Sequence, residues 1–152
     1  MRPTLRLLLA TAAAAALVLV PVVRAAEAGS AAKIVAPDSL SFTPAQGLPA
    51  GAEIAVLYGD PSKEGPFTVR FKLPAGYTIA THSHPTDEFL TVISGKARMA
   101  FGEDANEAKA EPLGPGSFTS LPAGAWHRLW IDADTVIELH STGPFAVKSH
   151  TD

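Results

Sequence analysis

Short runs of alternating apolar and polar residues fill the chain beyond its first thirty or so positions. In one of them, Phe67, Val69, Phe71 and Leu73 alternate with polar residues. Because successive side chains of a strand point to opposite faces, these four are expected to face inward. Turns marked by glycine and proline recur every six to twelve residues between such runs. Evenly spaced short strands of this kind predict an all-β sandwich or barrel.

A second run predicts another half-buried strand. Glu88, Leu90 and Val92 share one face of it, and the residues between them share the other. The pair Ser94-Gly95 that follows is typical of a two-residue hairpin loop. Read in this way, it predicts two short antiparallel strands that meet at this turn.

The N-terminal 28 residues have the pattern of a secretory signal peptide. Arg2 and Arg6 precede the run 7–20, which contains only apolar residues and one threonine, and small residues follow. The alternative is an uncleaved membrane anchor, but the run of about 14 residues is shorter than the roughly 20 that span a bilayer. We therefore expect a periplasmic or secreted protein without a stable membrane anchor after cleavage. The candidate cleavage sites follow Ala25, Ala26 and Ala28.

Composition narrows the class of protein further. The chain has 152 residues, 47% of them hydrophobic, and a formal net charge of −3, which excludes a disordered chain. No run of lysine and arginine is present, so a nucleic-acid partner is not expected. The absence of cysteine excludes disulfides, thiolate zinc sites, iron–sulfur clusters and a cysteine nucleophile. Removal of residues 1–28 would leave nine basic and fourteen acidic residues, a mildly acidic domain.

Three of the five histidines and one glutamate form the candidate metal site. His82 and His84 are two residues apart in an extended run, so their imidazoles project from one face and can share one ion. Glu88 starts the next inward-facing set, and His127 opens another strand after a Pro-Ala-Gly turn. Three imidazoles and one carboxylate suit a borderline divalent ion and leave positions open for water or substrate.

The spacing of these residues resembles the two motifs of the cupin family. In the first motif, five residues lie between Gly76 and His82-x-His84, three between His84 and Glu88, and six between Glu88 and Gly95. In the second motif, five residues separate Gly116 from Pro122-x-Gly124, and His127 follows after two more. Many cupins have asparagine where this chain has Ile131. That asparagine is not a metal ligand, so the departure concerns only a structural detail.

The resemblance implies a single-domain double-stranded β-barrel of the jelly-roll type, with one divalent ion in its mouth and often a homodimeric assembly. We expect a signal peptide at 1–28, a flexible segment with the first strand at 29–49, the cupin domain at 50–148 and a short tail at 149–152. The sequence does not determine whether the ion is Zn, Cu, Ni, Fe or Mn. Affinity order favours Zn or Cu in a domain that acquires its metal outside the cytoplasm.

Glu138 and His140 are weaker candidates. They alternate with Ile137 and Leu139, and either set of side chains can face inward. If the polar set faces the barrel mouth, Glu138 and His140 would support the metal ligands or transfer protons. The alternative is an exposed polar face.

The resemblance leaves three functions open, because one fold hosts many activities. The first is a small-molecule metalloenzyme, of the kind found among dioxygenases, decarboxylases and isomerases. The second is a metal-dependent module that binds or senses a small ligand without turnover. The third is a structural metal site in an inert domain. The open coordination positions expected at the ion favour the enzyme, because structural zinc sites are closed.

The leader generates the first testable prediction. Intact mass spectrometry of exported protein should show a chain that begins after Ala25, Ala26 or Ala28. The full-length mass in a membrane fraction would instead support the anchor.

Overall fold

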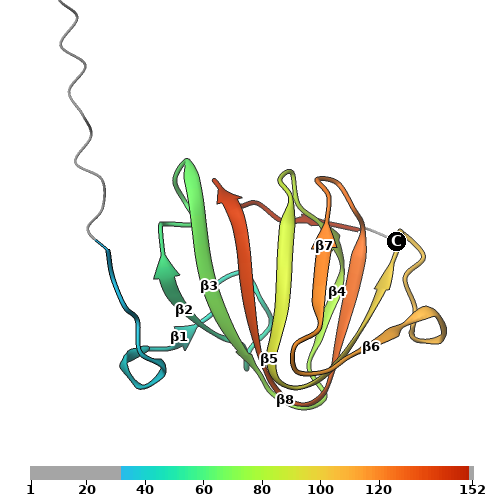
Figure 1. Ribbon diagram of the computed structural model, residues 1–152. Helices are drawn as coiled ribbons and strands as arrows, with labels where there is room; N and C mark the ends of the chain where they lie inside the picture. The colour runs from blue at the N-terminus through green and yellow to red at the C-terminus, as the bar shows by residue number, and fades with distance from the viewer. Residues whose placement is uncertain (1–31, 151–152) are drawn as a thin grey trace, which may run out of the picture. The chain divides into compact units, whose positions relative to one another are not determined.

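Two long strands run through the whole domain. The computed structural model describes residues 32–150, and within them β5 (Glu88–Phe101) and β8 (His127–Gly143) are the longest elements. They pair antiparallel along almost their full length (Figure 1). The predicted signal peptide, its cleavage sites and the last two residues of the predicted tail lie outside the described residues.

Shorter strands flank this central pair and complete one antiparallel sheet of nine strands. They are β1 (Thr43–Pro44), β2 (Glu53–Tyr58), β3 (Gly65–Leu73), β4 (Thr78–Ser83), β6 (Glu111–Leu113), β7 (Phe118–Leu121) and β9 (Lys148–Ser149). Two single 3-10 turns, η1 (Pro37–Ser39) and η2 (Glu107–Lys109), are the helical elements of residues 32–150. None of the helices described there is long and apolar enough to cross a membrane.

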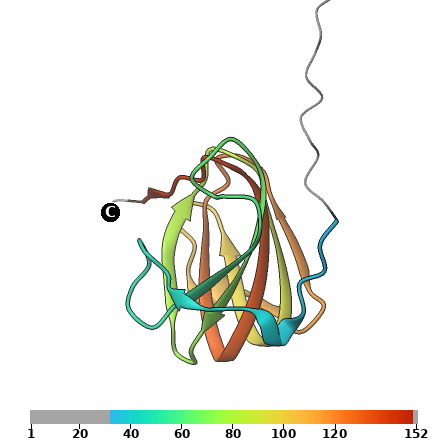
Figure 2. The same cartoon turned by 90° about the vertical axis from the view of Figure 1, so that its left-hand side faces the viewer.

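The sheet folds over into two layers because both long strands bend midway. One layer has the order β1-β2-β3-β8-β5-β7 and uses residues 88–94 of β5 and 135–143 of β8. The other has the order β9-β4-β8-β5-β6 and uses residues 96–101 and 127–133 of the same strands. The bends lie at the bottom of Figure 1, and Figure 2 shows the strands arranged around a common interior. The predicted all-β barrel fold is confirmed.

The bend in β5 lies where the sequence predicted a hairpin, and that prediction was wrong. The strand continues through Ser94 and Gly95, with shifts of its register against β8 between Val92 and Ala97. Gly95 has a φ of 91°, and a Cβ atom at this position would stand 2.3 Å from the carbonyl oxygen of Asp134. Glycine therefore lets β5 approach β8 more closely than any side chain would permit, and the resulting bulge bends the strand.

The alternation of the sequence matches the burial observed in the structure. Phe67, Val69 and Leu73 of β3 are buried, Phe71 is half-buried against the core, and Leu90 of β5 is buried with them. The interior between the layers is completed by apolar side chains of the paired strands. They include Ala97, Met99, Leu121, Leu129, Ile131, Ile137 and Leu139.

Substitution of Gly95 tests whether close approach or backbone conformation governs the bend. Gly76 has a φ of 81°, but a Cβ there would meet no atom within 4 Å, so Gly76→Ala is the matched control. We expect Gly76→Ala to lower the free energy of unfolding by about 1 kcal/mol. Gly95→Ala should lower the free energy of unfolding by about 3 kcal/mol or more, because the steric overlap of the new Cβ with β8 adds to the backbone strain of a positive φ. Urea unfolding measures both values, and equal losses would contradict the role given to close approach.

Candidate metal centre

Four buried side chains from both layers meet at one end of the interior. His82 lies near the end of β4, His84 follows that strand, and His127 opens β8 opposite His82. Glu88 opens β5 in the other layer. Glu88 and His127 stand at opposite ends of the β5–β8 ribbon, which pairs Glu88 with Ser141 and His127 with Phe101. Only the fold-over of that ribbon brings these two residues together.

The candidate ligand atoms are close to one another. One ring nitrogen of each histidine lies within 4.8 Å of the corresponding atoms of the other two. Oε2 of Glu88 is 3.3 Å from Nε2 of His84 and 3.3 Å from Nε2 of His127. The four residues that the sequence predicted as metal ligands are therefore brought together in one cluster.

Main-chain carbonyl groups fix the orientation of all three imidazoles. Each ring donates a hydrogen bond from Nδ1 to a carbonyl oxygen, which can only accept. The neutral ring then carries its lone pair on Nε2, as in the histidine ligands of metalloproteins. The Nδ1–oxygen distances are 2.8 Å from His82 to Ala80, 2.9 Å from His84 to Ala146 and 3.0 Å from His127 to Ala125.

The centre is rich in lone pairs and lacks a hydrogen-bond donor. Nε2 of His84 and Oε2 of Glu88 are buried and have no hydrogen-bond partner among the described residues. Buried polar atoms are almost always paired, so such atoms require an explanation. A cation that accepts their lone pairs satisfies them, and a set of three nitrogens and one oxygen suits a divalent ion.

Burial keeps two of these histidines neutral. Loss of solvent around His82, together with the neighbouring His127, lowers its pKa to about 4. Burial also lowers the pKa of His84, although the Glu88 carboxylate opposes the shift. A neutral imidazole is the form that binds a metal, and both rings are in that form at neutral pH.

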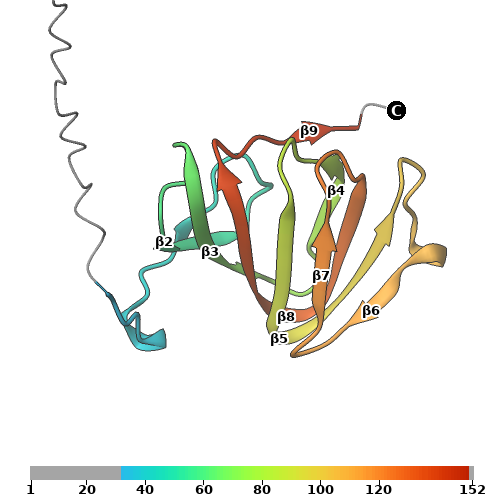
Figure 3. The same cartoon turned by 45° about the horizontal axis from the view of Figure 1, so that its top comes forward.

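The segment that follows β8 contacts His84 from two sides, and the sequence pattern did not predict this role. The ring of Phe145 stacks on the His84 ring at a centroid distance of 4.2 Å and an angle of 19°, and Ala146 supplies the carbonyl acceptor. Strand β9, which crosses above β4 in Figure 3, then pairs with β4 beside His82. No local pattern in residues 144–149 indicates these contacts, because they depend on the return of the chain to β4.

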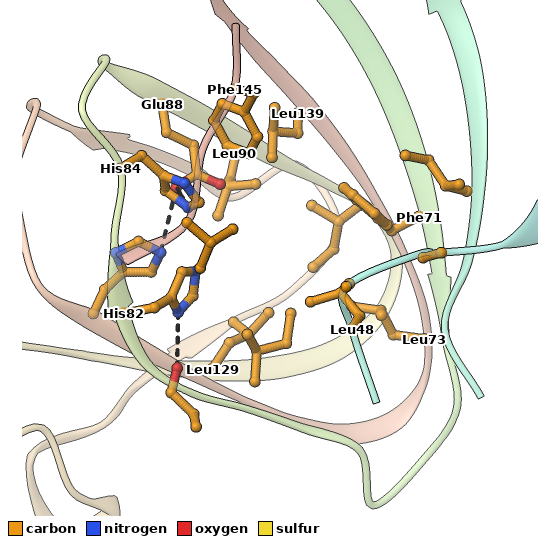
Figure 4. Close-up of a pocket in the computed structure, with 18 of the residues that line it drawn as sticks. Leu48, Phe71, Leu73, His82, His84, Glu88, Leu90, Leu129, Leu139 and Phe145 are labelled. Atoms are coloured by element: carbon orange, nitrogen blue, oxygen red, sulfur yellow. Dashed lines mark hydrogen bonds and ion pairs between the residues drawn. The ribbon is translucent and has the colours of Figure 1, made fainter. Parts of the chain in front are cut away.

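A pocket of about 390 Å³ leads away from the cluster. In Figure 4, His82, His84 and Glu88 lie at one end of the pocket, and Leu48 and Phe71 lie at the other. The loop 45–49 forms part of the far wall. The hydroxyl of Tyr77 anchors this loop by donating to the carbonyl oxygen of Pro49 at 2.7 Å. No motif in the sequence indicated that this loop is part of the site.

Glu138 and His140 do not face the barrel mouth, which corrects one alternative considered for them. Their neighbour Leu139 lines the pocket, so these two side chains project from the opposite face of β8. There Glu138 accepts a hydrogen bond from Nε of Arg70 at 2.7 Å. Nδ1 of His140 is 2.8 Å from the hydroxyl of Thr68, and its Nε2 is 3.2 Å from Glu138. The pair belongs to a polar network on the outer face and does not contact the ligands.

A folded-over antiparallel sheet with a buried three-histidine cluster at one end defines a small β-barrel protein with a candidate metal centre. The family profile of the cupin domain matches residues 69–143. The chain belongs to the cupin superfamily, as the motif spacing predicted. No curated protein sequence matches it significantly.

Solved structures with the same fold include enzymes. The polyketide cyclase RemF of Streptomyces resistomycificus is 15% identical, with a TM-score of 0.66 over 80% of this chain and 87% of that one. A sugar phosphate isomerase of Silicibacter pomeroyi is 17% identical, with a TM-score of 0.60 over 77% and 92%. A protein assigned as an acetylacetone dioxygenase of Methylibium petroleiphilum is 21% identical, with a TM-score of 0.59 over 78% and 81%. At this identity, the likeness shows a common fold.

The lack of a donor in the centre predicts an unusual effect of a conservative substitution. In metal-free protein, Glu88→Gln should raise the free energy of unfolding by about 1 kcal/mol. The reason is that an amide N–H can donate to Nε2 of His84 or His127, where the carboxylate cannot. Chemical denaturation of chelator-treated protein measures this change.

Glu138→Gln is the control, because it removes a carboxylate from the ion pair with Arg70 on the outer face. The free energy of unfolding of this variant should fall by about 0–1 kcal/mol, which is what ion pairs near the surface contribute. A loss of stability in metal-free Glu88→Gln would show that the carboxylate already has a donor partner.

Proposed function

We propose that this protein binds one divalent metal ion through His82, His84, Glu88 and His127 and is a metal-dependent enzyme that acts on a small molecule. The observation that carries the proposal is the convergence of their buried lone pairs, without a donor, at the end of a pocket. A bound ion would supply a Lewis acid or a redox centre, and one that takes five or six ligands would keep coordination positions open beyond these four residues.

The protein's own groups would prepare this centre. The carbonyl groups that accept from Nδ1 hold the imidazoles in one tautomer, so little reorganisation is needed on metal binding. Phe145 covers one face of His84 and restricts its movement. The apolar pocket walls exclude water from a ligand's body and strengthen electrostatic interactions at the polar end.

Support for an enzyme comes from the four candidate ligands, whose free lone pairs face the pocket, and from the fold. The names of similar structures include a cyclase, an isomerase and a dioxygenase. At 15–21% identity they support only the capacity of this fold for such chemistry. We propose a reaction of the dioxygenase, decarboxylase or isomerase type. The metal, among Zn, Cu, Ni, Fe and Mn, is left to elemental analysis.

A second candidate function is metal-dependent binding of a small ligand without turnover. One observation favours it. Apart from the four candidate ligands, the polar side chains of residues 32–150 that line the pocket are Gln46, Thr81 and Ser149. None of these three is an effective general acid or base near neutral pH. Any proton transfer by the protein would therefore depend on Glu88 or on a histidine of the cluster.

A turnover screen separates these two functions. Protein stripped of metal and reloaded separately with Zn, Cu, Ni, Fe or Mn is assayed against catechols, flavonols, 1,3-diketones and small organic acids, with oxygen uptake and product mass as readouts. Turnover that is lost in His127→Ala supports the enzyme. Saturable binding without product for any metal supports the binding module.

Export and homodimer formation are further proposals. The leader pattern of residues 1–28 supports a periplasmic or secreted location, and membership of the superfamily supports a homodimer. The expected partner of the site is a small molecule. Fractionation of the expressed protein and sedimentation analysis test the two proposals separately.

Alanine substitution tests the proposed ligands. His82→Ala, His84→Ala and His127→Ala should each lower the affinity for the metal at least about 100-fold, because each removes a coordinating atom. Loss of a residue that only hydrogen-bonds to a ligand typically lowers the affinity about 10–100-fold, and loss of a ligand itself should cost more. His140→Ala is the matched control, since this histidine lies on the outer face, and it should retain the metal. Elemental analysis with competitive chelator titration measures both quantities. Unchanged stoichiometry in His84→Ala and His127→Ala would contradict the assignment.

A further inference from the structure

The charges around the pocket are confined to one end. Among residues 32–150, no lysine or arginine lines it, and its charged or titratable lining groups are the four candidate ligands. The remaining wall is formed mainly by leucine, isoleucine, methionine, alanine, proline and phenylalanine side chains. Outside the cluster, such a wall offers a second negative charge on a ligand no cationic partner, only the uncharged polar side chains of Gln46, Thr81 and Ser149.

The polar end can neutralise only a limited charge. A divalent ion held by three neutral imidazoles and the Glu88 carboxylate keeps one net positive charge. One anionic oxygen donor would balance it. At the far end, beside Leu48, Phe71 and Leu73 (Figure 4), an anionic group would lose part of its water against apolar side chains and would meet no cationic side chain, because the polar residue of the loop there, Gln46, is uncharged.

The size of the pocket points to a compact ligand body. Phe145 is fixed between two rings: it stacks on His84 and meets Phe67 edge to face at 5.2 Å. Phe71 lines the pocket farther from the cluster. The volume of about 390 Å³ is near the lower end of the range for ligand pockets, roughly 300–1,000 Å³. A single substituted ring fits such a space better than a sugar chain or a nucleotide.

We propose that the ligand of this site is a small molecule with one oxygen-donor end, neutral or singly negative, and an uncharged apolar body about the size of one ring. Dicarboxylates and phosphate esters, which carry charge away from the donor end, are excluded. This inference rests on the proposed function, since the donor end is taken to meet the metal. It adds the substrate class that the family alone does not define.

A matched pair of probes tests this selectivity. 4-Methylcatechol and 3,4-dihydroxybenzoate share the same pair of oxygen donors and differ by a methyl group against a carboxylate at the opposite position of the ring. Calorimetric titration of zinc-loaded protein should show at least tenfold tighter binding of 4-methylcatechol. Zinc is chosen because it does not oxidise catechols, and the zinc content is measured again after each titration. Metal-free protein should keep the same order of affinity, because the apolar wall remains.

Leu48 provides a variant that should change the preference. It is half-buried in the loop 45–49 at the far end of the pocket, so a longer side chain can be accommodated there. Leu48→Arg should reduce the preference for 4-methylcatechol at least tenfold, because the guanidinium can pair with the carboxylate of the other probe. Leu48→Met is the matched uncharged control and should keep the preference of the unsubstituted protein. Thermal unfolding verifies that both variants are folded.

The outcomes separate this inference from the proposed function. Equal affinities, tighter binding of 3,4-dihydroxybenzoate, or no binding of 4-methylcatechol to either form of the protein would overturn the inference. Failure to bind zinc, or absence of turnover, would count against the proposed function instead. In that case a retained preference in metal-free protein would still support the apolar selectivity of the pocket.

Discussion

The close approach of β5 to its partner strand β8 at Gly95, where both strands bend, is the constraint on which the rest of the structure depends. Straight strands of this length would hold Glu88 and His127 roughly 40 Å apart, at about 3.3 Å per residue. The bend brings their side-chain atoms to 3.3 Å. Buried Thr135 stabilises this close approach, because its hydroxyl oxygen accepts a hydrogen bond from the Lys96 amide at 3.0 Å. Glycine at this one position thus allows one ribbon to form both walls of the barrel and to contribute residues to both sides of the candidate metal centre.

Without a bound cation, the unpaired polar atoms of the centre destabilise the folded protein. Glu88 and His84 are withdrawn from water, yet Glu88 Oε2 and His84 Nε2 gain no hydrogen bond in return. Their desolvation lowers stability, and the surrounding apolar core must compensate. A bound ion would reverse the sign of this contribution, because it binds the folded arrangement and not the separated residues of the unfolded chain. Binding and folding would then be strongly coupled.

The sequence predicts the parts of this protein that depend on side-chain pattern. Alternation in β3 and β5 identified the inward faces, and the spacing of His82, His84 and Glu88 identified residues that the structure brings together. Ser94-Gly95 was misread because a glycine with positive φ is equally suited to a turn and to a bulge. Only the partner strand, which is remote in sequence, decides between them.

Other parts of the site could not be predicted because they depend on tertiary contacts or on the main chain. The two faces of the segment around Glu138 are both plausible by composition. The opposite layer, which the fold-over of the β5–β8 ribbon brings into place, determines which face is buried. Phe145 and the loop 45–49 line the pocket only because the fold brings segments that are distant in sequence next to the cluster. The acceptors of the imidazole hydrogen bonds are carbonyl groups, which every residue has and no residue type indicates.

The use of carbonyl groups has a consequence for how such a protein can change over generations. The acceptors belong to Ala80, Ala125 and Ala146, so the orientation of the imidazoles does not require any particular side chain at these positions. Mutations in the pocket walls can therefore alter the molecule that is accommodated while the geometry of the centre persists. A fold arranged in this way can come to accommodate new ligands by drift in its lining residues, while the candidate metal ligands keep their arrangement.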